Sequence, residues 1–145
     1  MGLFDSMSTA LTGVNVYQTW MDAISDNVAN VNDVTTTSQA AYQPRYVVAE
    51  SIAGQVEGTG AGSAEEADIG GGVEVTGIAL GDPAGVVEYD PDNPLADKHG
   101  MVRATDVDLG TQMTDMIMAQ NGYEANLATI NRAQDAYQAA LGLKV

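Results

Sequence analysis

The carboxylates of a turn-rich segment near residue 90 are the strongest candidates for metal ligands in this sequence. Asp90 and Asp92 would occupy positions 1 and 3 of a calcium-binding EF-hand loop. The pattern then fails, because position 6 is Leu95, where glycine is required, and position 12 is Met101, where a bidentate glutamate is required. We therefore interpret the segment as a turn with solvated carboxylates and not as a calcium site.

The other candidate chemistry is equally incomplete. The single histidine, His99, has no cysteine and no second histidine with which to form a zinc or iron site. Gly58, Gly60 and Gly62 suggest a phosphate loop, but the third glycine of the dinucleotide pattern would fall at Ser63, and no lysine completes a Walker pattern. No serine or threonine has a histidine partner beyond His99. We expect no catalytic residues, no metal and no cofactor, and predict that the protein is not an enzyme.

Composition excludes several classes of partner. The chain carries 20 acidic against 5 basic residues, a formal charge of -15, which argues against nucleic acid and anionic membranes. There is no run of eighteen apolar residues and no basic segment followed by an apolar one. We therefore expect neither direct membrane insertion nor a cleaved Sec-type signal peptide. Cysteine is absent, so disulfides and thiolate metal sites are excluded together.

The last third of the chain carries a regular apolar stripe between residues 109 and 141, with alternating steps of four and three. This heptad pattern predicts a helix about 50 Å long that buries one narrow seam against another helix. We expect the helix to begin at Thr105 or Asp106, with Asp108 in its first turn. The stripe consists of Leu109, Met113, Met116, Gln120, Tyr123, Leu127, Ile130, Gln134, Tyr137 and Leu141.

A second helix is predicted near the start of the chain, over residues 3–31. Its apolar positions recur at steps of three and four residues, and the turn-favouring stretch 30–38 ends it. The simplest arrangement pairs the two helices as an antiparallel hairpin. The first 33 residues contain acids but no base, so apolar packing must hold the pair together. The apolar positions are Phe4, Met7, Leu11, Val14, Tyr17, Met21, Ile24, Val28 and Val31.

Between the helices lies an insert, residues 34–106, that predicts a small β-module. Strands are expected at 45–52, 73–78 and 87–89, and a fourth at 101–103 is an open alternative. The glycine- and acid-rich stretch 54–72 predicts a flexible loop. The expected fold is mainly α with this small β insert, the terminal helices pairing as a coiled-coil-like hairpin. Residues 1–33 plus 107–145 would form the axial core.

The outer face of the second helix is rich in alanine and amide side chains and poor in charge. Helices that face water usually carry many lysines and glutamates. Small side chains instead allow other helices to approach closely, which favours burial among copies or relatives of the same hairpin. A contact of that kind that does not close generates a helical filament. The alternative is that alanine is simply the best helix former.

Three stretches resemble the axial proteins of the bacterial flagellum. Ser25–Asn32 resembles the signature near the start of rod and hook proteins, and residues 107–126 resemble their C-terminal helix. Tyr89–Val102 resembles the Y-[DE]-P-x-x-P block, which together with the short length points to the proximal rod protein C family. Gly122, where that family commonly has Ala or Ser, is expected to mark a close helix contact.

The resemblance implies a structural subunit of the proximal rod of the flagellar basal body. Such a subunit would polymerise through its terminal helices into the torque-transmitting drive shaft that crosses the periplasm. Implied partners are copies of itself, other flagellar rod proteins, and the inner-membrane ring and export apparatus at the rod base. Export would pass through the flagellar type III apparatus without a cleaved signal peptide. The alternatives are another rod or hook-family axial protein, or a secreted coiled-coil adaptor.

We predict that the functional residues are those of the helix seam and the subunit interface. Asn27 and Asn30 would bond the backbone or neighbouring helices, or else serve only as caps at the end of the first helix. The full predicted set is Leu11, Val14, Tyr17, Ile24, Asn27, Val28, Asn30, Leu109, Met113, Met116, Tyr123, Leu127, Ile130, Tyr137 and Leu141.

Overall fold

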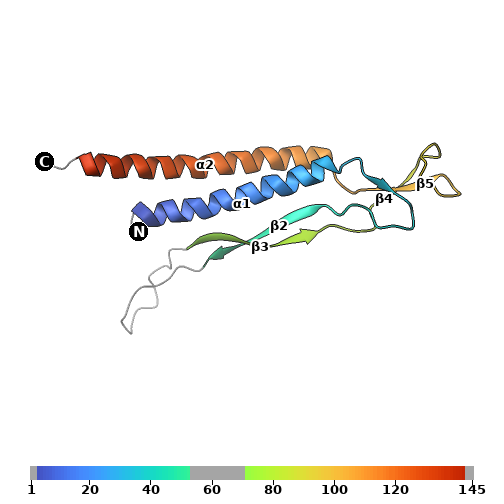
Figure 1. Cartoon of the computed structure of the whole chain (residues 1–145), viewed down its shortest axis with the longest axis horizontal. Helices are drawn as coiled ribbons and strands as arrows, with labels where there is room; N and C mark the ends of the chain where they lie inside the picture. The colour runs from blue at the N-terminus through green and yellow to red at the C-terminus, as the bar shows by residue number, and fades with distance from the viewer. Residues whose placement is uncertain (1–2, 53–70, 143–145) are drawn as a thin grey trace, which may run out of the picture.

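The computed structural model describes residues 3–52 and 71–142, and two long helices dominate it. Helix α1 spans Leu3–Ala29 and helix α2 spans Leu109–Gly142. They run antiparallel and side by side, so the beginning of α1 and the end of α2 lie at the same end of the molecule (Figure 1). We call this the open end, and the opposite end, where α1 ends and α2 begins, the closed end.

Helix α2 starts later than predicted, and the reason is local hydrogen bonding. The Thr105 amide donates to the Asp33 carbonyl at 3.3 Å, and its hydroxyl donates to the Tyr42 carbonyl at 3.2 Å. Asp108 then caps the helix, because its carboxylate accepts the Thr111 amide at 2.9 Å and the Gly110 amide at 3.3 Å. The predicted start at Thr105 or Asp106 is therefore wrong, and Asp108 precedes the first turn rather than lying within it.

Helix α1 ends two residues before the predicted position 31. The Asn30 amide donates to the carbonyls of Asp26 and Asn27, both at 3.2 Å, and the Asp33 amide donates to the Asn30 carbonyl at 2.9 Å. These hydrogen bonds form the tight turns that end α1, and the chain then enters β1, Val34–Thr35.

The strands form two small antiparallel sheets rather than one module. In the first sheet, β5 (Met101–Ala104) lies between β1 and β4 (Val86–Tyr89), beyond the closed end of the helix pair (Figure 1). The second is a ribbon of β2 (Arg45–Ile52) and β3 (Gly72–Leu80) that packs along α1.

All three predicted strands are present, and so is the strand at 101–103 that the sequence left open. A register shift between Val48 and Ala49 interrupts the ladder of the ribbon. The predicted flexible loop at 54–72 lies outside the described residues except for Gly71 and Gly72, and Gly72 already belongs to β3.

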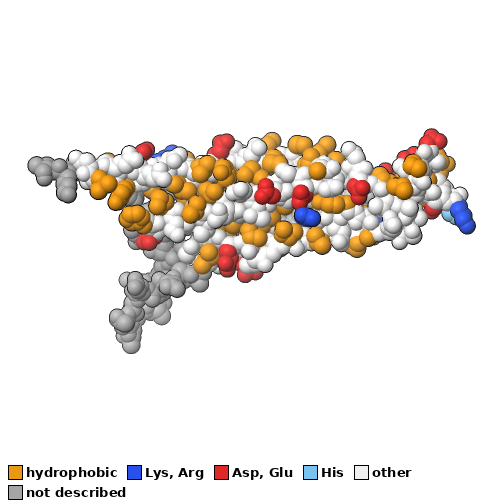
Figure 2. All heavy atoms as spheres, viewed as in Figure 1, with side chains coloured by type: hydrophobic (Ala, Val, Ile, Leu, Met, Phe, Trp, Pro, Cys, Tyr) orange, Lys and Arg blue, Asp and Glu red, His pale blue; other side chains and the backbone are white. Residues whose placement is uncertain are grey.

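The core of the described residues is thin and consists mainly of small side chains. Its largest apolar members are Val14, Ile24 and Val102, and the two most completely buried of them, Ile24 and Val102, lie near the closed end. Many large apolar side chains remain exposed instead. Figure 2 shows hydrophobic side chains of all sizes at many places on the surface of the helix pair. The buried apolar residues are Ala10, Val14, Ala23, Ile24, Ala41, Val102, Ala119 and Ala133.

Helix α2 has a single packing partner among the described elements. Both strands of the β2–β3 ribbon contact α1, but neither contacts α2, and the sheet at the closed end does not contact it either. Most of the circumference of α2 is therefore left uncovered by the described elements.

Candidate functional site

A buried amide links three parts of the fold at the closed end. The Asn27 side chain is 1% exposed. Its amide nitrogen donates to the Arg45 carbonyl at 3.0 Å and to Gln112 Oε1 at 2.9 Å. Its oxygen accepts the Arg45 amide at 2.8 Å and the Tyr42 hydroxyl at 3.2 Å. All four hydrogen-bonding positions of the Asn27 amide are thus filled, and they connect α1 to α2 and to the start of β2.

Asn30 behaves differently, although the sequence placed the two asparagines together. Its amide nitrogen donates to the Asp26 carbonyl one turn back, at 2.7 Å, which is a local bond at the helix end. The Asp26 carboxylate pairs with the Arg45 guanidinium at 2.6 Å, with both side chains about half exposed. Of the two interpretations left open, bonding to a neighbouring helix describes Asn27, and a helix-terminal role describes Asn30.

The middle of the pair is held by glycines that let the helices approach. A Cβ on Gly122 would lie 2.4 Å from ring atoms of Tyr17, and one on Gly13 would lie 2.6 Å from Oδ1 of Asn126. The Asn126 side chain is itself held by donating to the Gly122 carbonyl at 2.8 Å. Gly122 therefore marks a close helix contact, as expected from the sequence.

The open end relies on apolar side chains that remain largely in solvent. The rings of Phe4 and Tyr137 meet edge to face, with centroids 5.5 Å apart. Together with Met7, Ala133 and Gln134 they line a shallow cavity of about 220 Å³. Phe4 is 62% exposed and Tyr137 is 44% exposed. This end therefore presents an apolar surface.

The line of closest contact along α2 differs from the apolar stripe predicted as the seam. The buried residues of α2 are Gln112, Ala119 and Ala133, spaced by multiples of seven. Small side chains lie between the helix axes, and the larger side chains of the stripe lie to either side. In α2, Met116, Tyr123, Leu127 and Ile130 are half-buried, and Leu109, Met113, Tyr137 and Leu141 are exposed; in α1, Val14 and Ile24 are buried, Tyr17 and Val28 half-buried, and Leu11 exposed.

The uncovered side of α2 carries residues that the predicted set missed. Ile117 is 59% exposed and Met118 is 56% exposed. Leu109, Met113 and Ile117 recur every four residues, so they form one ridge, which we call the outer ridge. The sequence did contain a signal for them: Ile117 and Met118 directly follow Met116 of the stripe, and a narrow heptad stripe cannot hold three successive apolar residues.

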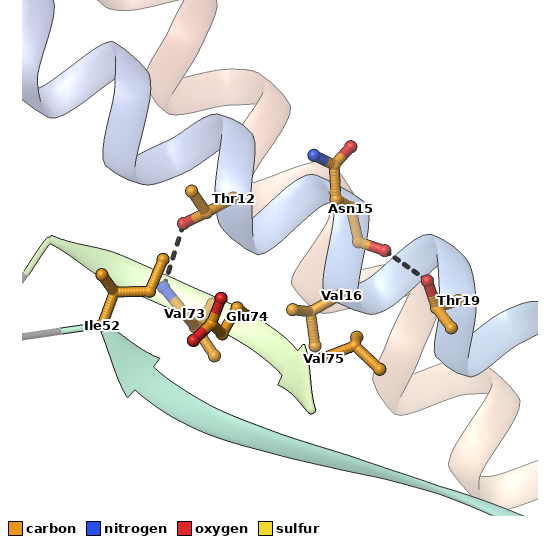
Figure 3. A pocket seen from close by; sticks show the side chains of 8 residues that line it. All are labelled: Thr12, Asn15, Val16, Thr19, Ile52, Val73, Glu74 and Val75. Atoms are coloured by element: carbon orange, nitrogen blue, oxygen red, sulfur yellow. Dashed lines mark hydrogen bonds between the residues drawn. The ribbon is translucent and has the colours of Figure 1, made fainter. Parts of the chain in front are cut away.

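A groove of about 300 Å³ separates α1 from the β2–β3 ribbon. Figure 3 shows Val16 of α1 and Val75 of β3 pointing toward each other across it. The Thr12 hydroxyl accepts the Val73 amide at 3.1 Å and donates to the Thr9 carbonyl at 2.7 Å, so it fastens the ribbon to the helix. The groove offers packing contacts and no nucleophile with an adjacent base.

The carboxylates of the 90–100 segment stabilise turns. The Asp97 carboxylate accepts the Met101 amide at 3.0 Å and the His99 amide at 2.7 Å. These bonds lower the pKa of the Asp97 carboxyl below its ordinary value, and the bond from Met101 has the larger effect. Asp90 accepts the side-chain amide of Asn93 at 3.1 Å. Within the ranges 3–52 and 71–142, no group of three or more His, Asp or Glu side chains could hold a metal ion.

Among the described residues, no helix is both long and apolar enough to cross a bilayer.

Comparison with known proteins assigns the family. Residues 98–143, which include β5 and α2, match the family model described as flagellar basal body rod FlgEFG protein C-terminal. The flagellar basal-body rod protein FlgC of Borreliella burgdorferi is 32% identical, and the alignment covers 99% of this chain and 98% of that protein.

Two further relatives agree with this match. FlgC of Agrobacterium fabrum is 32% identical over 91% of this chain and 88% of that protein. FlgC of Bacillus subtilis is 27% identical over 97% of both. The similarity therefore extends through both helices and the strands between them. The chain belongs to the flagellar basal-body rod protein FlgC family.

Proposed function

We propose that this protein is a structural subunit of the flagellar basal-body rod and that it assembles through the outer surfaces of its terminal helices. Membership in a family of structural rod proteins supports a structural rather than an enzymatic role. The observation that carries the assembly part is the outer ridge, because it lies on a helix that only α1 covers among the described elements.

Exposed apolar side chains in a continuous ridge favour a protein contact. Single exposed apolar residues are ordinary, but contiguous ones mark interaction surfaces. Fully burying an exposed side chain of this kind contributes about 1.5–3 kcal/mol. Leu109, Met113 and Ile117 are 44%, 47% and 59% exposed, so a contact would gain about half of that contribution from each. Charge supports the same conclusion, since the face carrying this ridge has few ionisable groups to desolvate.

The finer parts of the proposal concern geometry and neighbours. The helix pair would pack with neighbouring helices in a coiled-coil manner, and the resulting tube would transmit torque through many stiff contacts. Proposed neighbours are copies of the chain, other rod proteins, and the inner-membrane ring and export apparatus at the rod base. The division into an axial core, 1–33 plus 107–145, and an insert, 34–106, stays a prediction that fits this arrangement.

Substitutions at Ile117 test the assembly surface. Ile117→Asp places a charge on the outer ridge, and we expect it to abolish swimming and to remove the subunit from purified basal bodies. Because Ile117 is mostly exposed, the melting temperature of the purified chain should change little. Ile117→Leu is the matched control at the same position, and it should swim normally.

The experiment separates assembly from production of the subunit. Export of the Ile117→Asp variant is measured in the culture medium of a strain that lacks the natural copy. Normal swimming by this variant would contradict the assignment of the outer ridge to an interface. Loss of swimming accompanied by a lower melting temperature would mean that the residue supports the fold instead.

A further inference from the structure

The dipeptide Asn121–Gly122 lies in the interior of α2, and it is the only Asn–Gly pair in the chain. We propose that it is a deamidation site which the helix pair keeps closed, so that prolonged separation of α2 from α1 modifies the chain irreversibly. The reaction concerns a single chain and takes water as its only co-reactant. The inference therefore stands whether or not the chain assembles into a rod.

The reaction at such a pair begins within the chain. The Gly122 backbone nitrogen attacks Cγ of the Asn121 side chain and a C–N bond forms. The side-chain nitrogen leaves as ammonia and takes with it the proton of the Gly122 amide. Water then opens the resulting five-membered imide at either carbonyl and gives aspartate or isoaspartate. In total one water is consumed, one ammonia is released, and the chain gains one negative charge.

Gly122 makes the pair reactive, and the structure gives a packing reason for glycine at this position. A Cβ on residue 122 would shield the attacking nitrogen, so deamidation is fastest where glycine follows asparagine. That same Cβ would lie 2.4 Å from ring atoms of Tyr17. The close helix contact therefore requires the residue type that makes Asn121 labile. Asn121 itself is exposed, so water reaches its side chain.

The helical backbone holds the two reacting atoms apart. Ring closure requires the Gly122 nitrogen to eclipse Cβ of Asn121, and a helical ψ of about −42° keeps it far from that position. In a helix the Gly122 amide also donates to the carbonyl four residues earlier, which is that of Met118. Deamidation must therefore wait until this part of α2 opens.

The opening of α2 is controlled by its pairing with α1. Among the described elements, α1 is the only one that contacts α2. Helices gain most of their stability from such packing, and glycine has a lower intrinsic helix propensity than any residue except proline. The segment around Asn121 therefore loses its helix when it separates from Tyr17 and the rest of α1, and the reaction can then proceed.

Mass spectrometry of peptides measures the rate, because conversion of the amide to an acid raises the peptide mass. Asn131, which Arg132 follows on the same helix, is the internal reference for an exposed asparagine without a following glycine. In guanidinium chloride we expect Asn121 to react at least tenfold faster than Asn131. In native buffer at the same pH, we expect Asn121 to react at least tenfold more slowly than in the denaturant.

Two variants separate the helix pair from the dipeptide. Tyr17→Ala removes the ring that covers Gly122 and leaves the sequence of α2 unchanged, so the rate at Asn121 in native buffer should rise at least threefold. Tyr46→Ala is the matched control, since this tyrosine lies on β2, which does not contact α2, and the rate should stay at its natural value. Gly122→Ala should make Asn121 as slow as Asn131 even in denaturant.

The natural chain gives the same test should Tyr17→Ala fail to fold. At intermediate denaturant concentrations, the rate at Asn121 should rise in parallel with the loss of helix measured by circular dichroism. The consequence of the reaction is tested on its product. Isoaspartate lengthens the backbone beside Gly122, so the modified chain should unfold at a lower denaturant concentration. Asn121→Asp adds the same charge without lengthening the backbone, and it should unfold close to the natural concentration.

Four results would overturn the inference. Equal rates at Asn121 in buffer and in denaturant would show that the helix does not close the site. A rate in denaturant no faster than at Asn131 would show that the dipeptide is not labile. An unchanged rate in a folded Tyr17→Ala chain would assign the protection to α2 alone. An isoaspartyl chain as stable as Asn121→Asp would show that the reaction leaves the helix pair intact.

Discussion

The core of the helix pair is thin, and its two ends differ in how completely their side chains are buried and hydrogen-bonded. At the closed end, Asn27, Ile24 and Val102 are each no more than 2% exposed, and every hydrogen-bonding position of the Asn27 amide is filled. At the open end, Phe4 and Leu141 are 62% and 58% exposed. The polar side chain of Asn27 is therefore buried far more completely than the large apolar side chains of Phe4 and Leu141. Among the described residues, the closed end is completed by hydrogen bonds within the chain, whereas the open end leaves large apolar side chains exposed.

The largest expected effect comes from deleting one amide at the closed end. Asn27→Ala leaves the Arg45 backbone, the Tyr42 hydroxyl and Gln112 without their partner, and we expect the free energy of unfolding to fall by about 3 kcal/mol. Phe4→Ala removes a whole aromatic ring from the open end, yet we expect a loss of only about 1 kcal/mol, because the ring is mostly exposed already. Urea denaturation followed through the fluorescence of Trp20 measures both. Equal losses, or a larger loss for Phe4→Ala, would break the comparison.

A smaller effect is expected from the glycines between the two ends. Gly122→Ala raises helix propensity by about 1 kcal/mol, but the new Cβ would lie 2.4 Å from the Tyr17 ring. Overpacking costs about 1–3 kcal/mol, so we expect net destabilisation of about 1 kcal/mol. Gly110→Ala is the matched control on the same helix, since its nearest neighbour atoms lie 3.7 Å away, and it should be neutral or stabilising. A Gly122→Ala variant that melts at a higher temperature would show that the helices can separate without cost.

The smallest effect is a pH dependence located at the closed end. Hydrogen bonds from the Thr111 hydroxyl, the Thr111 amide and the Gly110 amide lower the pKa of Asp108 below its ordinary value of 3.8. A depressed carboxyl pKa contributes stability that is present above the ordinary value and is lost as the pH falls through the lowered one. The melting temperature should therefore drop below about pH 3.8. Asp108→Asn keeps a capping side chain but cannot titrate, so its melting temperature should fall less over that range. Parallel acid profiles for the two proteins would argue against this role.

The sequence predicted the helices and strands well, but it predicted poorly which residues lie in the closest contact between the two helices. Periodicity placed the apolar stripe of the second helix at 109–141, and the structure has the helix at Leu109–Gly142. The strands also followed from alternation and turn residues, because those signals are local. The start of α2 was missed because Thr105 is held by Tyr42 and Asp33, which are distant in the chain.

The seam shows why hydrophobicity alone could not select the buried face. The heptad stripe favoured large apolar residues such as Met113 and Tyr137, whereas the buried residues of α2 are Gln112, Ala119 and Ala133. Close approach of two helices selects for small size, a property that a hydrophobic pattern does not measure. The burial of Gln112 depends on Asn27, which lies 85 positions earlier in the chain, so no local window contains both.

The dependence of α2 on a single neighbour also has a mechanical consequence. Within the described residues, a pull applied along the exposed side of α2 reaches the other elements across the seam with α1 or through β5, the strand that precedes it. The middle of the seam uses small residues such as Ala119 and Gly122, whereas at the closed end the Asn27 amide is tied to the backbone of β2. Under load, the closed end would therefore carry the greatest share of the stress, and the two helices would begin to separate from the opposite end.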